Sequence, residues 1–255
     1  MDLPSVLTRE FTEREPIVAR EQLLSEEGGI ILLDKPYGET SFFVVNQIRK
    51  GISRSTGIKW VKVGHAGTLD PLATGLLVIA TRRMTKQMPA MMGLDKTYTL
   101  RLRLGLTSES FDLERPITIT SDLQGISEQT VLSALSQFRG ELSQIPPAHS
   151  AIKQHGKPVY LQARKGIETE LQPRSIFVRS MSVTEMAIPY VGLQVECSKG
   201  TYIRSLVRDI GDALGTGAVL VDLRRDTVGP WSIEDAVSLH HAIELVKPAP
   251  IKEEV

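Results

Sequence analysis

Strict alternation of apolar and polar residues predicts strands in several parts of the chain. In "TYTLRLRL", residues 97–104, the side chains of Tyr98, Leu100, Leu102 and Leu104 fall on one face of an extended chain. Threonine and arginine side chains fall on the other face, so we expect a half-buried strand. Alternating or short apolar segments predict four further strands, at 30–33, 76–81, 191–197 and 218–223.

Apolar residues three and four positions apart predict helices. The first follows Ser41, a residue suited to cap a helix, and places Val44, Val45, Ile48 and Ile52 on one face. Similar patterns predict three more helices. One extends over 127–140, with Val131, Leu132, Leu135 and Phe138 on one face. A second extends over 203–214, with Thr201 as its cap and Gly215 after its end, and a third extends over the methionine-rich segment 84–94, interrupted by Pro89.

The order of these elements predicts the fold class. Strands and helices do not alternate regularly, so we expect an α+β fold with a mixed, mainly antiparallel central sheet flanked by helices and loops. A chain of 255 residues is long enough to bury a substantial core.

Composition adds expectations about the compartment. Cys197 is the single cysteine, which excludes an internal disulfide and suits a reducing cytosol. The first residues lack a basic start followed by an apolar run, and the longest apolar runs are too short to span a membrane. We therefore expect a cytoplasmic protein without membrane contact. The sequence does not give the oligomeric state, for which we expect a monomer.

Charge is balanced overall but unevenly distributed. The 30 basic residues equal the 30 acidic ones, yet residues 40–94 hold eight Lys or Arg and only one acid, Asp70. Residues 142–167 hold four basic residues and no acid. A basic face that binds a polyanion such as nucleic acid would explain this pattern, and chance clustering on solvated faces is the alternative.

The lone carboxylate of Asp70 is the first candidate for chemistry. It lies in "GHAGTLDPLATGLL", residues 64–77, where glycines and small residues allow close approach of a ligand. Basic surroundings favour its ionised form, and an ionised carboxylate can act as nucleophile or base. The alternative is an ordinary turn aspartate in "LDP".

A second candidate lies at a helix start. "SKGTYIRSL" places Tyr202 and Arg204 in the first turn of the helix, where anions are favoured and an arginine can hold a carboxylate in a forked pair. A surface arginine beside a packed tyrosine is the alternative. The five histidines and the single cysteine show no metal-ligand spacing, and no phosphate-binding loop is present, so we expect no metal and no cofactor.

Six segments of the chain resemble the TruB-type tRNA pseudouridine synthases, which isomerise uridine-55 in the T-loop of tRNA. The resemblance extends over about residues 28–235 and rests on "LLDKPYGETS", "GHAGTLDPLATGLL", "DKTYTLRLRLG", "IPPAHSAIKQHGKPVYLQARKG", "CSKGTYIRSL" and "LVDLRRDTVG". It implies the pseudouridine-synthase fold, the T-arm of tRNA as partner, and base flipping before reaction.

The resemblance also implies roles for individual residues. Asp70 is the catalytic aspartate, Arg204 pairs with it, and Tyr98 stacks beside the target base and can serve in proton transfer. Four further residues are implied in substrate binding or in supporting the site: Tyr202, which contacts the flipped uracil; Leu223, which lines the pocket; His65, which fills space in the T-loop; and Lys35, which lies close to the site with a structural role.

The resemblance predicts the domain organisation as well. We expect an N-terminal extension at 1–27, a catalytic domain at 28–235 with an RNA-binding thumb loop at 142–167, and a C-terminal tail at 236–255 without an RNA-binding domain of the PUA type. Asp226 departs from the family pattern, which usually has threonine after "LRR".

The reaction implied by the resemblance adds and removes no atoms, so it requires no cofactor. Asp70 either attacks C1′ of the ribose or removes the 2′ proton, and the sequence does not separate these routes. The base that removes H5 also stays open between Tyr98, water and Asp70. Three alternatives are an RNA chaperone, a glycosidase, which would usually need a second carboxylate, and a pseudouridine synthase that acts on another RNA.

Overall fold

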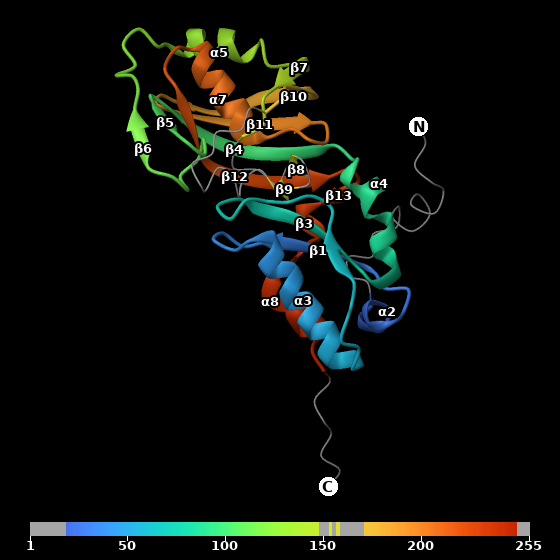
Figure 1. The fold of residues 1–255 in the computed structure, drawn as a ribbon. Coiled ribbons are helices and arrows are strands. Elements are labelled where there is room, and N and C mark those ends of the chain that lie inside the picture. The colour runs from blue at the N-terminus through green and yellow to red at the C-terminus, as the bar shows by residue number, and fades with distance from the viewer. Residues whose placement is uncertain (1–18, 148–152, 155–156, 159–170, 249–255) are drawn as a thin grey trace. The chain divides into compact units, whose positions relative to one another are not determined.

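Two compact units make up the computed structural model, which describes residues 19–147, 153–154, 157–158 and 171–248 (Figure 1). The first unit comprises 1–94 and 224–255, and the second comprises 95–223. The expected catalytic domain, 28–235, is therefore divided between two units. Strand β12 (Ala218–Val228) begins in the second unit and ends in the first.

The first unit is built on a mixed sheet. Strands β1 (Ile30–Lys35) and β3 (Thr74–Thr81) pair antiparallel, from Ile30 opposite Ala80 to Lys35 opposite Gly75. The short strand β14 (Val237–Ser238) is parallel to β1, and β2 (Val63–His65) is antiparallel to β3. The end of β12 pairs parallel with β3 and antiparallel with β13 (Trp231–Ser232).

Helices complete the core of the first unit. These are α2 (Arg20–Leu24), α3 (Ser41–Thr56), α4 (Met88–Met92) and α8 (Leu239–Val246), with 3-10 helices η1 (Arg82–Gln87) and η2 (Ile233–Asp235). Figure 1 shows α3 and α8 side by side below β1. The two helices approach closely because Gly51 has no side chain: a Cβ there would lie 2.4 Å from Cγ2 of Val246.

The second unit contains an antiparallel sheet of four long or medium strands. Their order is β4 (Lys96–Leu104), β11 (Tyr190–Cys197), β10 (Arg174–Ala187) and β7 (Gly140–Gln144). Helices α5 (Glu128–Leu135) and α7 (Ile203–Ala213) lie next to each other beside this sheet (Figure 1). Two small hairpins are formed by β5 (Leu106–Ser108) with β6 (Ile117–Ile119) and by β8 (Lys153–Gln154) with β9 (Lys157–Pro158).

The α+β class and the mainly antiparallel pairing are confirmed in both units. Each predicted strand is present, and all five extend beyond the predicted limits, β12 by the most. The alternation in β4 is confirmed, since Tyr98, Leu100, Leu102 and Leu104 are all buried. The predicted apolar face of α3 is buried too, and together with α8 it forms the core against β1 and β3.

Several helix limits differ from the prediction. Thr40 caps α3, accepting a hydrogen bond from the Phe43 N–H at 3.0 Å, whereas the Ser41 hydroxyl bonds to Leu69 instead. Helix α5 ends at Leu135, and Leu132 is 45% exposed rather than buried. The N-cap of α7 is Tyr202 and not Thr201. The first part of the predicted helix 84–94 belongs to the 3-10 helix η1, and Pro89 lies in the first turn of α4, where it does not interrupt the helix.

The expected terminal segments and thumb loop are described in part. Leu23, from the expected extension, is buried, and Ala242 and Val246, from the expected tail, belong to the same core cluster. Within 142–167 the structure describes 142–147 and the hairpin of β8 and β9; the remainder lies outside the described residues, as do 1–18 and 249–255.

Candidate active site

Asp70 lies on a turn that is fixed by the loop between β1 and α3. The turn precedes β3, and its Asp70 carbonyl accepts a hydrogen bond from the Ala73 N–H at 3.1 Å. The Ser41 hydroxyl contacts both the N–H and the carbonyl of Leu69 at 2.9 Å. On the other side of Asp70, the Pro71 carbonyl accepts from the Gly38 N–H at 2.9 Å. The half-buried Asp70 side chain is thus carried by a backbone held on both flanks.

Lys35 also joins the loop between β1 and α3 to the Asp70 turn, from the interior of the first unit. Its side chain is fully buried, and its ammonium donates to the carbonyls of Pro36 at 2.8 Å, Glu39 at 2.6 Å and Pro71 at 3.3 Å. Burial lowers the pKa of Lys35 to about 8, and the negative charges of Asp70 and two other nearby acids oppose the shift. A buried cation therefore attracts the Asp70 carboxylate while it fixes the loop. The expected structural role of Lys35 near the reaction site stays a prediction.

His65 lies at the end of β2, partly buried and close to the positive charge of Arg225. Burial and the positive charge of Arg225 lower the pKa of His65 below its ordinary value. Its Nδ1 accepts a hydrogen bond from the Gly67 N–H at 3.3 Å, which requires Nδ1 to be unprotonated. The imidazole is therefore expected to be neutral, with its proton on Nε2.

Arg225 is a residue of this region that the sequence analysis missed. It is buried, and it donates to the carbonyls of Leu76 at 2.7 Å and Gly67 at 3.0 Å. Its backbone lies so close to Gly75, where φ is +102°, that a Cβ at Gly75 would be 2.4 Å from the Arg225 carbonyl oxygen. The only sequence signal was the "LRR" segment, which does not indicate which arginine is buried.

Arg204 lies in the first turn of α7 and is almost fully buried. Its Nε is 3.6 Å from Oδ2 of Asp112, and its Nη1 donates to the Ser110 carbonyl at 3.2 Å. Asp112 is in turn oriented by hydrogen bonds from the Ser110 hydroxyl and the Glu114 N–H. Asp112 and Ser110 are functional candidates that the sequence analysis missed, because more than 90 positions separate them from α7.

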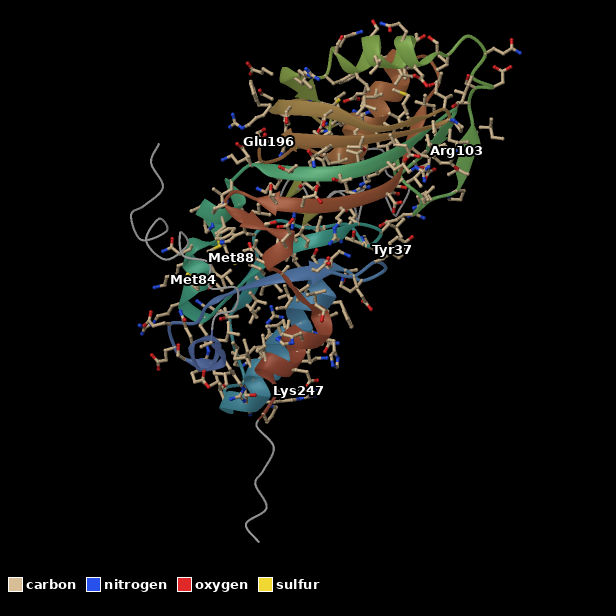
Figure 2. All side chains as sticks on the ribbon, turned by 180° about the vertical axis from the view of Figure 1, so that it is seen from behind. Tyr37, Met84, Met88, Arg103, Glu196 and Lys247 are labelled. Carbon is tan, nitrogen blue, oxygen red and sulfur yellow. The ribbon has the colours of Figure 1, made fainter. Side chains whose placement is uncertain are left out.

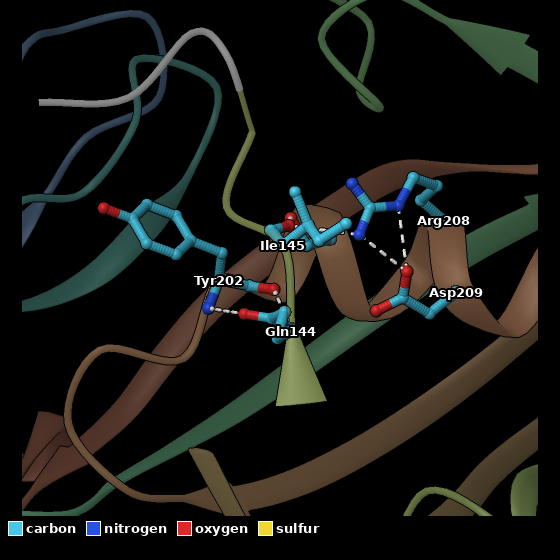
Figure 3. A network of polar contacts seen from close by, with 6 residues as sticks. Gln144, Ile145, Tyr202, Arg208 and Asp209 are labelled. Carbon is cyan, nitrogen blue, oxygen red and sulfur yellow. Dashed lines mark hydrogen bonds and ion pairs between the residues drawn. The ribbon is translucent and has the colours of Figure 1, made fainter. Parts of the chain in front are cut away.

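Tyr202 begins α7 and is anchored through its backbone (Figure 3). Its N–H donates to Oε1 of Gln144 at 2.9 Å, and its carbonyl accepts from Nε2 of the same side chain at 3.1 Å. Gln144 is buried at the end of β7. Figure 3 shows the ring of Tyr202 pointing away from Gln144, so the paired hydrogen bonds to Gln144 fix the backbone of Tyr202 and do not involve its ring.

The start of the expected thumb loop is attached to α7. The Ile145 carbonyl accepts from the Ser205 hydroxyl at 2.9 Å and from Nη2 of Arg208 at 3.1 Å (Figure 3). Arg208 also pairs with Asp209 at 2.7 Å and lies over the ring of Phe111 at 5.0 Å. Burial raises the pKa of Asp209, and Arg208 opposes this shift.

The remaining predicted residues lie on strands of the second unit. Tyr98 on β4 is 8% exposed and is opposite Val195, and Leu223 on β12 is half-buried. The first unit thus holds Lys35, His65 and Asp70, and the second holds the other four predicted residues. The structure brings Lys35 to Asp70, whereas the pairing of Asp70 with Arg204 stays a prediction.

Among the residues that the structure describes, no group of three or more His, Cys, Asp or Glu side chains could hold a metal ion. Within the same part of the chain, no helix has the length and apolar character needed to cross a membrane.

Comparison with protein families gives two matches that together extend over most of the chain. Residues 54–203 match the model of the TruB family pseudouridylate synthase N-terminal domain, and residues 204–249 match that of the tRNA pseudouridylate synthase B C-terminal domain. A tRNA pseudouridine synthase B from Phocaeicola vulgatus is 44% identical over 228 residues, which cover 89% of this chain and 97% of that protein. One from Clostridium tetani is 46% identical over 211 residues, 83% of this chain and 71% of that protein.

Solved structures show the same similarity at lower identity. A chain of a Cbf5–Nop10–Gar1 complex superposes with a TM-score of 0.66 and 30% identity over 89% of this chain. A chain of an H/ACA RNP bound to a substrate RNA containing 2′-deoxyuridine superposes with a TM-score of 0.62 and 29% identity over 86% of this chain. The match covers 56% and 53% of those chains, respectively.

Proposed function

This chain belongs to the TruB family of pseudouridylate synthases, and we propose that it isomerises uridine-55 in the T-loop of tRNA, with Asp70 as the catalytic carboxylate. The observation that carries the proposal is the Asp70 turn, which is fixed through Leu69 and Pro71 and lies beside the buried cation of Lys35. A carboxylate on a rigid backbone is preorganised for attack at one position of a substrate.

The reaction moves one bond of the nucleoside. The bond between N1 and C1′ breaks, the uracil turns, and C5 bonds to C1′, with H5 leaving C5 and a proton returning to nitrogen. Asp70 either attacks C1′ to form an ester, which the returning C5 displaces, or removes the 2′ proton to form a glycal. Both routes need the ionised carboxylate, which the Lys35 ammonium favours electrostatically.

We propose that the second unit supplies the groups that act on the flipped base. Arg204 would pair with Asp70, and its contacts with Asp112 and Ser110 support this role because they fix the position of the guanidinium. Tyr98 would stack beside the base, and Tyr202, anchored by Gln144, would contact the uracil edge. Leu223 would line the pocket. H5 would leave to Tyr98, water or Asp70.

The partner in this proposal is the T-arm of tRNA. The curated relatives are named as tRNA pseudouridine synthases, and one solved structure similar to this chain contains a substrate RNA. A neutral His65 could enter the T-loop without attracting a phosphate into the space left by the flipped base. We propose that the protein acts as a monomer in the cytoplasm, and that binding weakens steeply with salt.

Tritium release tests the proposal directly. A T-arm minihelix with uridine-55 tritiated at C5 is incubated with wild-type protein, with Asp70→Asn and with Asp122→Asn, which changes an exposed aspartate. Wild type and Asp122→Asn should release tritium, whereas Asp70→Asn should bind the minihelix and release none. Wild-type protein that binds without release would contradict the proposal and favour an RNA chaperone.

A further inference from the structure

Two large aromatic side chains near the Asp70 turn are exposed. Tyr37 is 60% exposed and Phe42 is 69% exposed. Figure 2 shows Tyr37 at the edge of the first unit, in the loop that joins β1 to α3. Tyrosine and phenylalanine normally bury much of their surface in a folded protein, so two exposed rings five positions apart call for an explanation.

Both rings are carried by backbone that cannot move freely. Tyr37 precedes Gly38, whose N–H donates to the Pro71 carbonyl at 2.9 Å. Phe42 follows Ser41, whose hydroxyl contacts Leu69 at 2.9 Å. Between them, the ammonium of Lys35 fixes the Glu39 carbonyl at 2.6 Å. Each ring is therefore one residue away from an anchor to the Asp70 turn.

We infer that Tyr37 and Phe42 form a stacking surface for unpaired nucleobases of the RNA substrate, next to the base that reacts. This inference rests on the proposed function and adds two substrate-binding residues to it. A nucleotide that leaves its loop to reach Asp70 separates its neighbours from their stacking partners. Aromatic rings are the protein groups that replace such stacking, because every base presents a π-face.

An RNA base fits this position better than a protein segment. The neighbours of the two rings, Gly38 and Ser41, bond to opposite flanks of the turn that carries the reacting carboxylate, so we expect an RNA bound at this turn to reach the rings. The nearby acid Asp34 is paired with Arg224 at 3.0 Å, which reduces its repulsion of phosphates. The backbone that carries the rings is held before binding, so only the side-chain torsions lose freedom in the complex.

The control residue is Trp60, an aromatic side chain that is 91% exposed. Phe42 lies in the first turn of α3, and Trp60 lies beyond the last turn of this helix of 16 residues. The helix is about 24 Å long at 1.5 Å per residue, so Trp60 lies away from the Asp70 turn. Removing Trp60 changes exposed aromatic surface on the same unit without touching the proposed stacking surface.

The test measures equilibrium binding of the T-arm minihelix to protein that carries Asp70→Asn, so that turnover plays no part. In this background, Tyr37→Ala and Phe42→Ala should each weaken binding about tenfold, as expected for loss of one stacked base. Tyr37→Phe should keep full affinity, and Phe42→Leu should lose it, because leucine retains apolar bulk without a π-face. Trp60→Ala should bind as the parent does.

Unchanged affinity in both alanine variants overturns the inference, and it leaves the proposed function intact if wild-type protein releases tritium. The inference is also overturned if Trp60→Ala weakens binding as much as Tyr37→Ala and Phe42→Ala do, or if Phe42→Leu binds with full affinity. A parent protein that does not bind the minihelix overturns the proposed function together with the inference. Thermal unfolding of each variant verifies that it is folded, which is expected because the replaced rings are mostly exposed.

Discussion

Arg204 and Asp112 form a buried ion pair, with 3.6 Å between Nε and Oδ2 and side-chain exposures of 4% and 5%. Asp112 also accepts hydrogen bonds from the Ser110 hydroxyl and the Glu114 N–H, so both partners have fixed orientations. A guanidinium held in this way would be preorganised for the proposed pairing with Asp70. The ion pair therefore belongs to the packed interior of the second unit, and it also orients the arginine that we propose to act beside Asp70.

Replacing Asp112 with asparagine should be strongly destabilising. Asp112→Asn removes the negative charge beside a buried guanidinium, and breaking such a pair costs about 3–5 kcal/mol. Glu185→Gln is the matched control, since Glu185 pairs with Arg101 at 3.0 Å on the surface, where a pair contributes about 1 kcal/mol or less. Urea unfolding measures both variants, and similar losses in the two would contradict the interpretation.

The stability of the protein should depend on Lys35 above pH 8. The pKa of Lys35 is about 8 in the folded chain and 10.5 when unfolded, so between these pH values the unfolded chain binds more protons. Raising the pH through this window therefore increases the contribution of Lys35 to stability. The free energy of unfolding of wild type should rise relative to Lys35→Met between pH 8 and 10. Parallel curves for the two proteins would refute a lowered pKa.

His65 should remain neutral at the pH of the cytosol. Its pKa lies below the ordinary 6.5, because burial and Arg225 disfavour the imidazolium. Nitrogen-15 NMR of the imidazole should show protonated Nε2 and unprotonated Nδ1, with the signal assigned through its loss in His65→Gln. A midpoint at or above 6.5 would show that the environment is not as described.

Cys197 should be unreactive in the folded protein. It is 1% exposed, and burial raises its pKa to about 11 from 9.0. The thiolate fraction at pH 8 is therefore about a hundredfold smaller than for an exposed thiol, apart from the steric barrier. Iodoacetamide should modify Cys197 at the rate of unfolding and rapidly in urea. Fast modification without denaturant would contradict the burial of this side chain.

The sequence predicted the elements whose pattern is local. The alternation in β4 and the apolar face of α3 were predicted correctly, because burial on one face leaves a direct periodic signal. The cap of α3 was misplaced by one residue because the Ser41 hydroxyl bonds to Leu69, 28 positions away. Leu132 has the spacing of a core residue but is exposed, since spacing does not show which side of α5 is covered.

The supporting contacts of the site could not be predicted in this way. The motifs indicated Asp70 and Arg204, but neither Asp112 nor Arg225 has a local feature that distinguishes it from other charged residues. Their partners are far apart in the sequence: Arg225 binds carbonyls about 150 positions earlier, and Arg204 contacts a segment about 90 positions earlier. Such contacts arise from sheet pairing, which depends on the whole fold.

Mapping the modified nucleotide tests the central claim most directly. An unmodified tRNA transcript is incubated with wild-type protein or Asp70→Asn, treated with carbodiimide and copied by reverse transcriptase, which stops at pseudouridine adducts. We predict a stop for nucleotide 55 with wild type, and none with Asp70→Asn or with a transcript that has cytidine at position 55. Modification elsewhere with none at 55, or an undiminished stop with Asp70→Asn, would contradict the account.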